Sequence, residues 1–105
     1  MHMNRFMKKW IDNITTINGL REFLKNLFRS RNVEVYLFGS HARGDNSEFS
    51  DVDLAILSKE DISEEITILK ALLEESNLPF KVDIIDLRKA PYLKEIIEKE
   101  GIRWI

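Results

Sequence analysis

Apolar residues recur at helical spacing in two well-marked parts of the chain. Between residues 18 and 30 they fall at i, i+3, i+4, i+7 and i+8, which predicts one apolar face of a helix that packs on a core. A second stripe runs through residues 62–73, where Asp61 and Ser63 are both candidate N-caps and Pro79 closes the pattern. We therefore expect two amphipathic helices.

The two ends of the chain carry shorter apolar patterns. Residues 1–13 could be a frayed lead-in or a first helical turn that packs Phe6 and Trp10. Pro91 suits the first turn of a last helix, and Gly101 suits a left-handed residue that ends it. The apolar tail, residues 102–105, is expected to pack either on the sheet or on a partner.

Three stretches rich in β-branched residues alternate in character and predict strands near residues 33–38, 51–57 and 81–87. Val35, Leu54 and Ile84 belong to the apolar faces, so these faces should meet the helices. The predicted fold class is α+β, a mixed sheet with helices packed on one face and an open, acidic opposite face. Asp86 shares the parity of Ile84, so we expect it at the strand end, facing solvent or capping a turn.

Length and composition narrow the classes of protein. A chain of 105 residues fits one domain, residues 1–105, with 44% hydrophobic and 32% charged residues and no cysteine. It has no apolar run long enough for a membrane span, and residues 1–10 lack the apolar core of a signal peptide, so we expect a cytoplasmic protein without membrane partners. A formal charge of −2 argues against nucleic acid as the main substrate.

Candidate chemistry gathers around a Gly-Ser turn and a pair of aspartates. Gly39 and Ser40 follow the first predicted strand, and a ten-residue spacer separates them from Asp51 and Asp53 at the head of the second. Side chains at i and i+2 of a strand share a face about 6 to 7 Å apart, where two carboxylates can share Mg²⁺ with a substrate phosphate. The alternative is a turn followed by a solvated acidic strand start.

Gly39-Ser40, ten residues and then Asp51-x-Asp53 resembles the signature of the polymerase-beta-type nucleotidyltransferases. The flanking residues, Ala42-Arg43-Gly44 and Ser50 to Leu54, are similar to the minimal nucleotidyltransferases, or MNT proteins, of prokaryotic toxin–antitoxin pairs. The resemblance runs from about Leu20 to the end of the sequence. It implies the nucleotidyltransferase fold and a third carboxylate on a neighbouring strand, for which Asp83 is the better candidate; the alternative is a solvated aspartate on an edge strand.

The resemblance also implies the roles of the site residues. Asp51, Asp53 and Asp83 would be the catalytic residues and would hold two Mg²⁺ ions, while Gly39 and Ser40 would bind the β- and γ-phosphates of ATP. From its place in the sequence, Arg43 could either steady the triphosphate or pair with a site carboxylate. Lys81 lies on the Asp83 face by parity and could moderate the repulsion among the carboxylates, but a solvated lysine is the default interpretation. Other neighbours are weaker candidates. His41 is interpreted as a solvent-exposed residue without a role in the site. Tyr36 and Phe38 could form the base of the site or pack in the core or on the sheet face.

The partner follows from the resemblance alone. It implies that the chain is an antitoxin which transfers AMP to a tyrosine of a HEPN-domain ribonuclease toxin, with which it could form a hetero-oligomer. Two alternatives stay open: a nucleotidyltransferase that modifies small molecules such as antibiotics, and a non-catalytic antitoxin that occludes its partner. No residue can be assigned to selection of the base.

Overall fold

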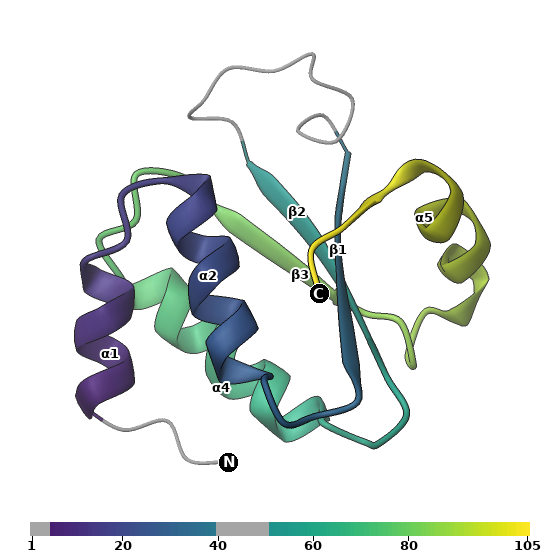
Figure 1. Cartoon of the computed structure of the whole chain (residues 1–105), viewed down its shortest axis with the longest axis horizontal. Helices are drawn as coiled ribbons and strands as arrows, with labels where there is room; N and C mark the ends of the chain where they lie inside the picture. The colour runs from purple at the N-terminus through teal and green to yellow at the C-terminus, as the bar shows by residue number, and fades with distance from the viewer. Residues whose placement is uncertain (1–4, 40–50) are drawn as a thin grey trace.

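The computed structural model describes residues 5–39 and 51–105, in which four strands form one sheet flanked by helices (Figure 1). The elements in chain order are α1 (Arg5–Asp12), α2 (Ile17–Leu27), β1 (Val33–Phe38), β2 (Val52–Ser58), α4 (Ser63–Glu75), β3 (Val82–Asp86), η1 (Pro91–Leu93), α5 (Lys94–Glu100) and β4 (Ile102–Arg103). Helix α1 confirms that the start of the chain contributes a helix.

The sheet has the strand order β3-β2-β1-β4. Strand β1 runs antiparallel to β2 and to β4, whereas β2 and β3 are parallel and joined through α4. This arrangement confirms the predicted mixed sheet, and the three predicted strands match the observed ones to within one residue at each end.

Helices α1, α2 and α4 cover one face of the sheet (Figure 1). Their buried side chains, such as Phe23 of α2 and Leu69 of α4, join a core that contains Val35 and Leu54 of the sheet, both fully buried. Trp10 of α1 packs edge-on against Phe23, with ring centroids 5.3 Å apart. The predicted helical face is therefore confirmed for these three helices.

Helix α5 departs from the prediction because it packs on the opposite face. Its buried Ile97 clusters with Tyr36, Ala55 and Leu87, whose side chains point away from the main core. An amphipathic pattern shows that one side of a helix is buried but not which sheet face it meets, so the sequence could not show this crossing. Among the described residues, the opposite face is thus covered near α5, and Asp53 and Asp83 lie toward its other end.

The prediction that Gly101 ends the last helix in a left-handed conformation is wrong. Gly101 has φ −82° and ψ 165°, an extended conformation. Its role is close approach: a Cβ there would lie 2.6 Å from the carbonyl oxygen of Ile97 and 3.1 Å from that of Leu37. After it, β4 pairs with β1 and Trp104 is buried, so the apolar tail packs on the sheet.

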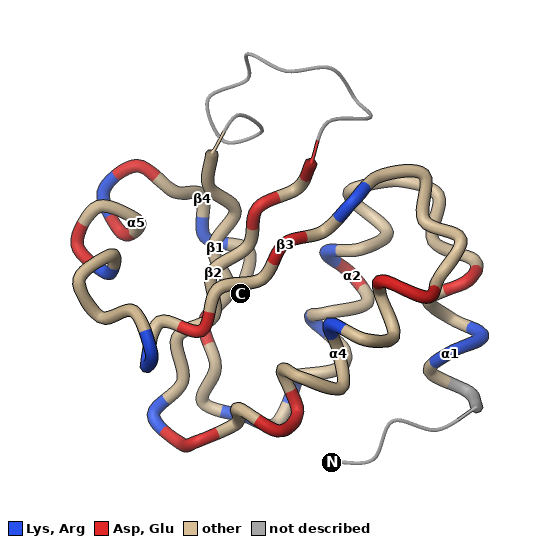
Figure 2. The backbone as a smooth tube through the Cα atoms, turned by 180° about the vertical axis from the view of Figure 1, so that it is seen from behind, with Lys and Arg blue, Asp and Glu red and all other residues tan. Residues whose placement is uncertain are grey.

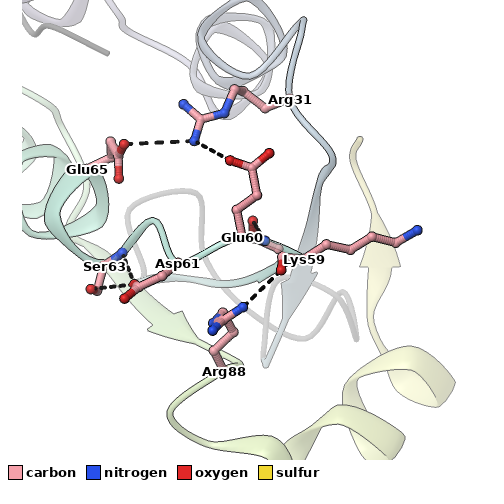
Figure 3. Close-up of polar contacts among 8 residues, drawn as sticks. Arg31, Lys59, Glu60, Asp61, Ser63, Glu65 and Arg88 are labelled. Atoms are coloured by element: carbon pink, nitrogen blue, oxygen red, sulfur yellow. Dashed lines mark hydrogen bonds and ion pairs between the residues drawn. The ribbon is translucent and has the colours of Figure 1, made fainter.

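A hydrogen bond ties together the segments that follow β2 and β3 (Figure 3). Asp86 is buried, and its carboxylate accepts a hydrogen bond from the backbone N–H of Arg88 at 3.0 Å, which confirms the turn cap and excludes the solvent-facing alternative. The Arg88 guanidinium donates to the carbonyl of Lys59 at 3.0 Å.

None of the described helices is both long and apolar enough to cross a membrane.

Candidate active site

Gly39 closes β1 in a conformation that favours glycine. Its φ is +75°, in the left-handed region that L side chains rarely adopt. A Cβ at this position would lie 2.5 Å from Oδ2 of Asp53, closer than atoms can approach without something moving. Both the backbone conformation and the space beside it therefore require glycine, because the Asp53 carboxylate occupies the place where a Cβ would be.

Asp53 lies between Gly39 and Asp83 across three neighbouring strands. In β2 it stands opposite Phe38, the last residue of β1, and level with Asp83 in the parallel β3. Adjacent strands lie about 4.8 Å apart, and residues level with one another point to the same face. Figure 2 shows the acidic segments of β2 and β3 side by side. The structure thus brings Asp53 and Asp83 together beside the Gly39 turn.

The apolar residues of the two strands fix this orientation. Val52 and Leu54 are fully buried under the helices, so Asp53 between them must point to the opposite face. The backbone N–H of Val52 donates to the carbonyl of Lys81 at 2.8 Å, which sets the register of the two strand starts. A slip by one residue would put the carboxylates into the core, so the register is strongly determined.

Asp51 is exposed and precedes β2. Together with Asp83 it lines a groove of 760 Å³ between β3 and the end of α4, whereas Asp53 is not part of this lining. No three Asp, Glu or His side chains within residues 5–39 and 51–105 are grouped so that they could hold a metal ion. The metal site of three carboxylates therefore stays a prediction.

Several predicted site residues lie outside the described residues, namely Ser40, His41 and Arg43. Of the two aromatic candidates, Phe38 is half-buried opposite Asp53, while Tyr36 is buried in the cluster under α5. The Tyr36 hydroxyl donates to Glu34 at 3.4 Å. Burial, with a further contribution from the Glu34 carboxylate, raises the pKa of Tyr36 above its usual 10.0. Its burial in this cluster makes Tyr36 a packing residue.

The groove beside Asp83 was missed by reasoning from the sequence. Lys70 and Glu74 of α4 form part of its wall, and both look like ordinary solvated residues in the helical pattern. Only the relative placement of α4 and β3 makes them neighbours of the site, and no local pattern carries that information.

Comparison with known proteins defines the class. The sequence model described as "Polymerase beta, Nucleotidyltransferase" matches residues 21–104, so the chain belongs to this family. The family confirms the predicted nucleotidyltransferase domain and its fold class.

Curated proteins similar to this chain carry adenylyltransferase names. A probable protein adenylyltransferase of Haemophilus influenzae, MntA, is 39% identical over 67 residues, covering 62% of this chain and 59% of the relative. The match therefore spans less than two thirds of that protein. A candidate protein adenylyltransferase of Methanocaldococcus jannaschii is 37% identical over 91 residues, covering 79% of this chain and 88% of the relative.

Solved structures share the fold. A crystal structure of a toxin–antitoxin with AMP-PNP is similar with a TM-score of 0.55 and 26% identity, covering 81% of this chain and 72% of that one. A candidate nucleotidyltransferase of Sulfolobus solfataricus has a TM-score of 0.51 and 18% identity, covering 98% of this chain and 89% of its own, and supports the fold alone.

Proposed function

We propose that this chain is a Mg²⁺-dependent protein adenylyltransferase that acts as an antitoxin. It transfers AMP from ATP to a tyrosine hydroxyl of a HEPN-domain ribonuclease toxin and thereby silences it, in a complex of the two proteins. The observation that carries the proposal is the apposition of the Gly39 turn with Asp53 and Asp83 on three adjacent strands.

The carboxylates fit Mg²⁺ that arrives with a nucleotide. Mg²⁺ keeps several waters and is usually held by one or two carboxylates plus substrate phosphates, not by a cage made of protein alone. Asp53 and Asp83 provide such a pair, with Asp51 close by in sequence at the mouth of the groove. When bound, the ions would neutralise charge that develops on the phosphate oxygens.

The residues can be assigned to the parts of an in-line displacement. The acceptor oxygen forms a bond to the α-phosphorus of ATP while the bond from that phosphorus to the α–β bridging oxygen breaks, and pyrophosphate leaves with the electron pair. Asp83 accepts the proton of the hydroxyl. Gly39, without a side chain, lets backbone N–H groups approach the leaving phosphates, and Ser40 is proposed to add its hydroxyl there.

The relatives support both the donor and the partner. Two of them are named as probable or candidate protein adenylyltransferases. The solved structure at 26% identity is a toxin–antitoxin that contains AMP-PNP, an ATP analogue. A net charge of −2 fits a protein acceptor better than a nucleic acid.

Transfer from ATP labelled at the α-phosphate tests the proposal. With Mg²⁺ and a HEPN-domain toxin as the acceptor, we expect label on a tyrosine of that protein, and no label after EDTA is added. Label that arrives only from the γ-phosphate would instead identify a kinase. Inhibition of the ribonuclease without any label would identify an antitoxin that occludes its partner.

A further inference from the structure

The 760 Å³ groove follows the outer edge of β3. Its lining includes Val82 and Ile84, which point to the helical face, and also Lys81 and Asp83, which point to the opposite face. A groove lined by both sets must run along the strand edge, because successive residues of a strand point to opposite faces. The facing wall belongs to α4 and the segment after it, and includes Lys70, Leu73, Glu74, Leu78 and Phe80.

The backbone of β3 offers hydrogen-bonding groups to this groove. β3 is the end strand of the sheet and pairs only with β2. The carbonyl of Lys81 accepts from β2, and the N–H of Leu87 donates to Ile56 in β2, so the odd-numbered residues face β2. Val82 and Ile84 therefore turn their N–H and C=O outward. Within the described part of the chain these outward groups have no backbone partner.

The geometry of the displacement indicates that the acceptor approaches from the same edge of the sheet. An in-line displacement places the attacking and leaving oxygens on opposite sides of the α-phosphorus. If pyrophosphate leaves on the Gly39 side, at β1, the acceptor must approach across Asp53 from the other side. In the order β3-β2-β1 that side is the edge of β3, where Asp83 is exposed.

The lining also indicates the chemistry of the acceptor. Its charged groups are the carboxylates of Asp51, Glu74 and Asp83 and the ammonium groups of Lys70 and Lys81. This balance repels a phosphate-rich strand. A polypeptide suits it, because backbone groups can pair with the strand edge while apolar side chains meet the apolar part of the wall.

We propose, resting on the proposed function, that the acceptor protein binds this groove as an extended segment that adds a strand to β3. The segment pairs with the outward groups of Val82 and Ile84 and presents its hydroxyl to Asp83. The edge would accommodate about five residues, the length of β3.

Amide hydrogen exchange on the complex measures the pairing of the acceptor segment with β3 directly. We would use the HEPN-domain partner with Mg²⁺ and α,β-methylene-ATP, whose α–β bridge does not break, so that the acceptor stays bound. The amides of Val82 and Ile84 should exchange at least about tenfold more slowly in the complex. The amides of Asp83 and Ile85 point to β2 and serve as internal controls that stay unchanged. Unchanged exchange at Val82 and Ile84, or slowing by the nucleotide alone, would overturn the proposal.

A pair of variants at one position tests the consequence for transfer. Val82→Pro removes the outward N–H at the first residue of an edge strand, a position that tolerates proline, and Val82→Ala keeps that N–H. We expect Val82→Pro to lower labelling of the partner at least about tenfold relative to Val82→Ala, which keeps the outward N–H and loses only the side-chain methyl groups. The rise in melting temperature caused by Mg²⁺ and ATP should be retained in both variants.

The two proposals fail in different ways. A wild-type chain that labels no protein contradicts the proposed function, and the exchange measurement then still decides whether the partner occupies the edge of β3. Equal labelling by wild type and Val82→Pro contradicts strand addition and leaves the proposed function standing. If Val82→Pro does not fold, the exchange measurement alone decides.

Discussion

At Gly39, both the backbone conformation and the neighbouring Asp53 carboxylate exclude a side chain. The positive φ disfavours any L side chain, and the Asp53 carboxylate occupies the place where a Cβ would be. The sequence motif identified Gly39, but only the structure shows that its neighbour in space is Asp53, fourteen positions further along the chain. The glycine therefore sets the distance between the turn and the carboxylate.

Gly39→Ala should reduce both stability and transfer. The left-handed conformation should cost about 1–2 kcal/mol of unfolding free energy, and displacement of the Asp53 carboxylate should lower AMP transfer at least about tenfold. Denaturant unfolding and the α-label assay measure the two effects. The control is Gly19→Ala in α2, where a Cβ would lie 3.3 Å from Oγ1 of Thr16. We expect a change within about 1 kcal/mol there and normal transfer. Normal transfer by Gly39→Ala would show that this contact does not matter.

At the scale of elements, periodicity identified the helices and strands because their apolar faces repeat at 3.6 or 2 residues. The same alternation placed Asp53 and Asp83 opposite the helical face, where the register aligns them. Contacts that depend on how elements cross could not be predicted. They include the packing of α5 on the second face, the close approach at Gly101 and the groove between α4 and β3.

The N-cap residue of α4 is Ile62, so the prediction that Asp61 or Ser63 is the N-cap is wrong. Asp61 instead binds Ser63, the first residue of the helix, from just outside it. Oδ1 of Asp61 accepts hydrogen bonds from Oγ of Ser63 at 2.7 Å and from its backbone N–H at 3.0 Å (Figure 3). These hydrogen bonds are the main reason that the pKa of Asp61 lies below its usual 3.8. A lowered pKa in the folded state means that the stabilisation is present above pH 3.8 and is lost as the pH falls through the folded value.

Asp61→Ala should therefore lower the melting temperature at pH 7, and the gap to wild type should shrink as the pH falls below 3.8. Asp61→Asn keeps a side-chain oxygen without the titrating group, so the gap between Asn and Ala should stay constant over the same range. Thermal unfolding followed by circular dichroism from pH 7 to about pH 3 measures both gaps. A gap between wild type and Asp61→Ala that does not change with pH would contradict the role of the ionised Asp61 carboxylate.

On the scale of the whole molecule, the core and the site lie on opposite faces of the same strands. The helices α1, α2 and α4 bury Val52 and Leu54, while Asp53 between them faces the site (Figure 1). Stability and chemistry are therefore separable: a carboxylate of the site can be neutralised without opening the core. Two carboxylates on adjacent strands also repel one another when no cation is bound.

Replacement of Asp53 by asparagine, which keeps the shape of the side chain and removes its charge, tests the whole arrangement. Without ligands, we expect a melting temperature equal to or slightly above that of wild type. In wild type, Mg²⁺ with ATP should raise the melting temperature in a concentration-dependent way, because a ligand that binds only the folded state stabilises it. Glu75→Gln, an exposed change at the end of α4, should behave like wild type.

The most direct measurement is thus the melting temperature of Asp53→Asn with and without Mg²⁺ and ATP, made beside the α-label assay. The variant should stay folded, lose most of the rise in melting temperature, and lose AMP transfer. Unfolding of the variant without ligands would show that Asp53 is a structural residue. Transfer at near the wild-type rate would show that nucleotidyl transfer does not depend on the carboxylate beside Gly39.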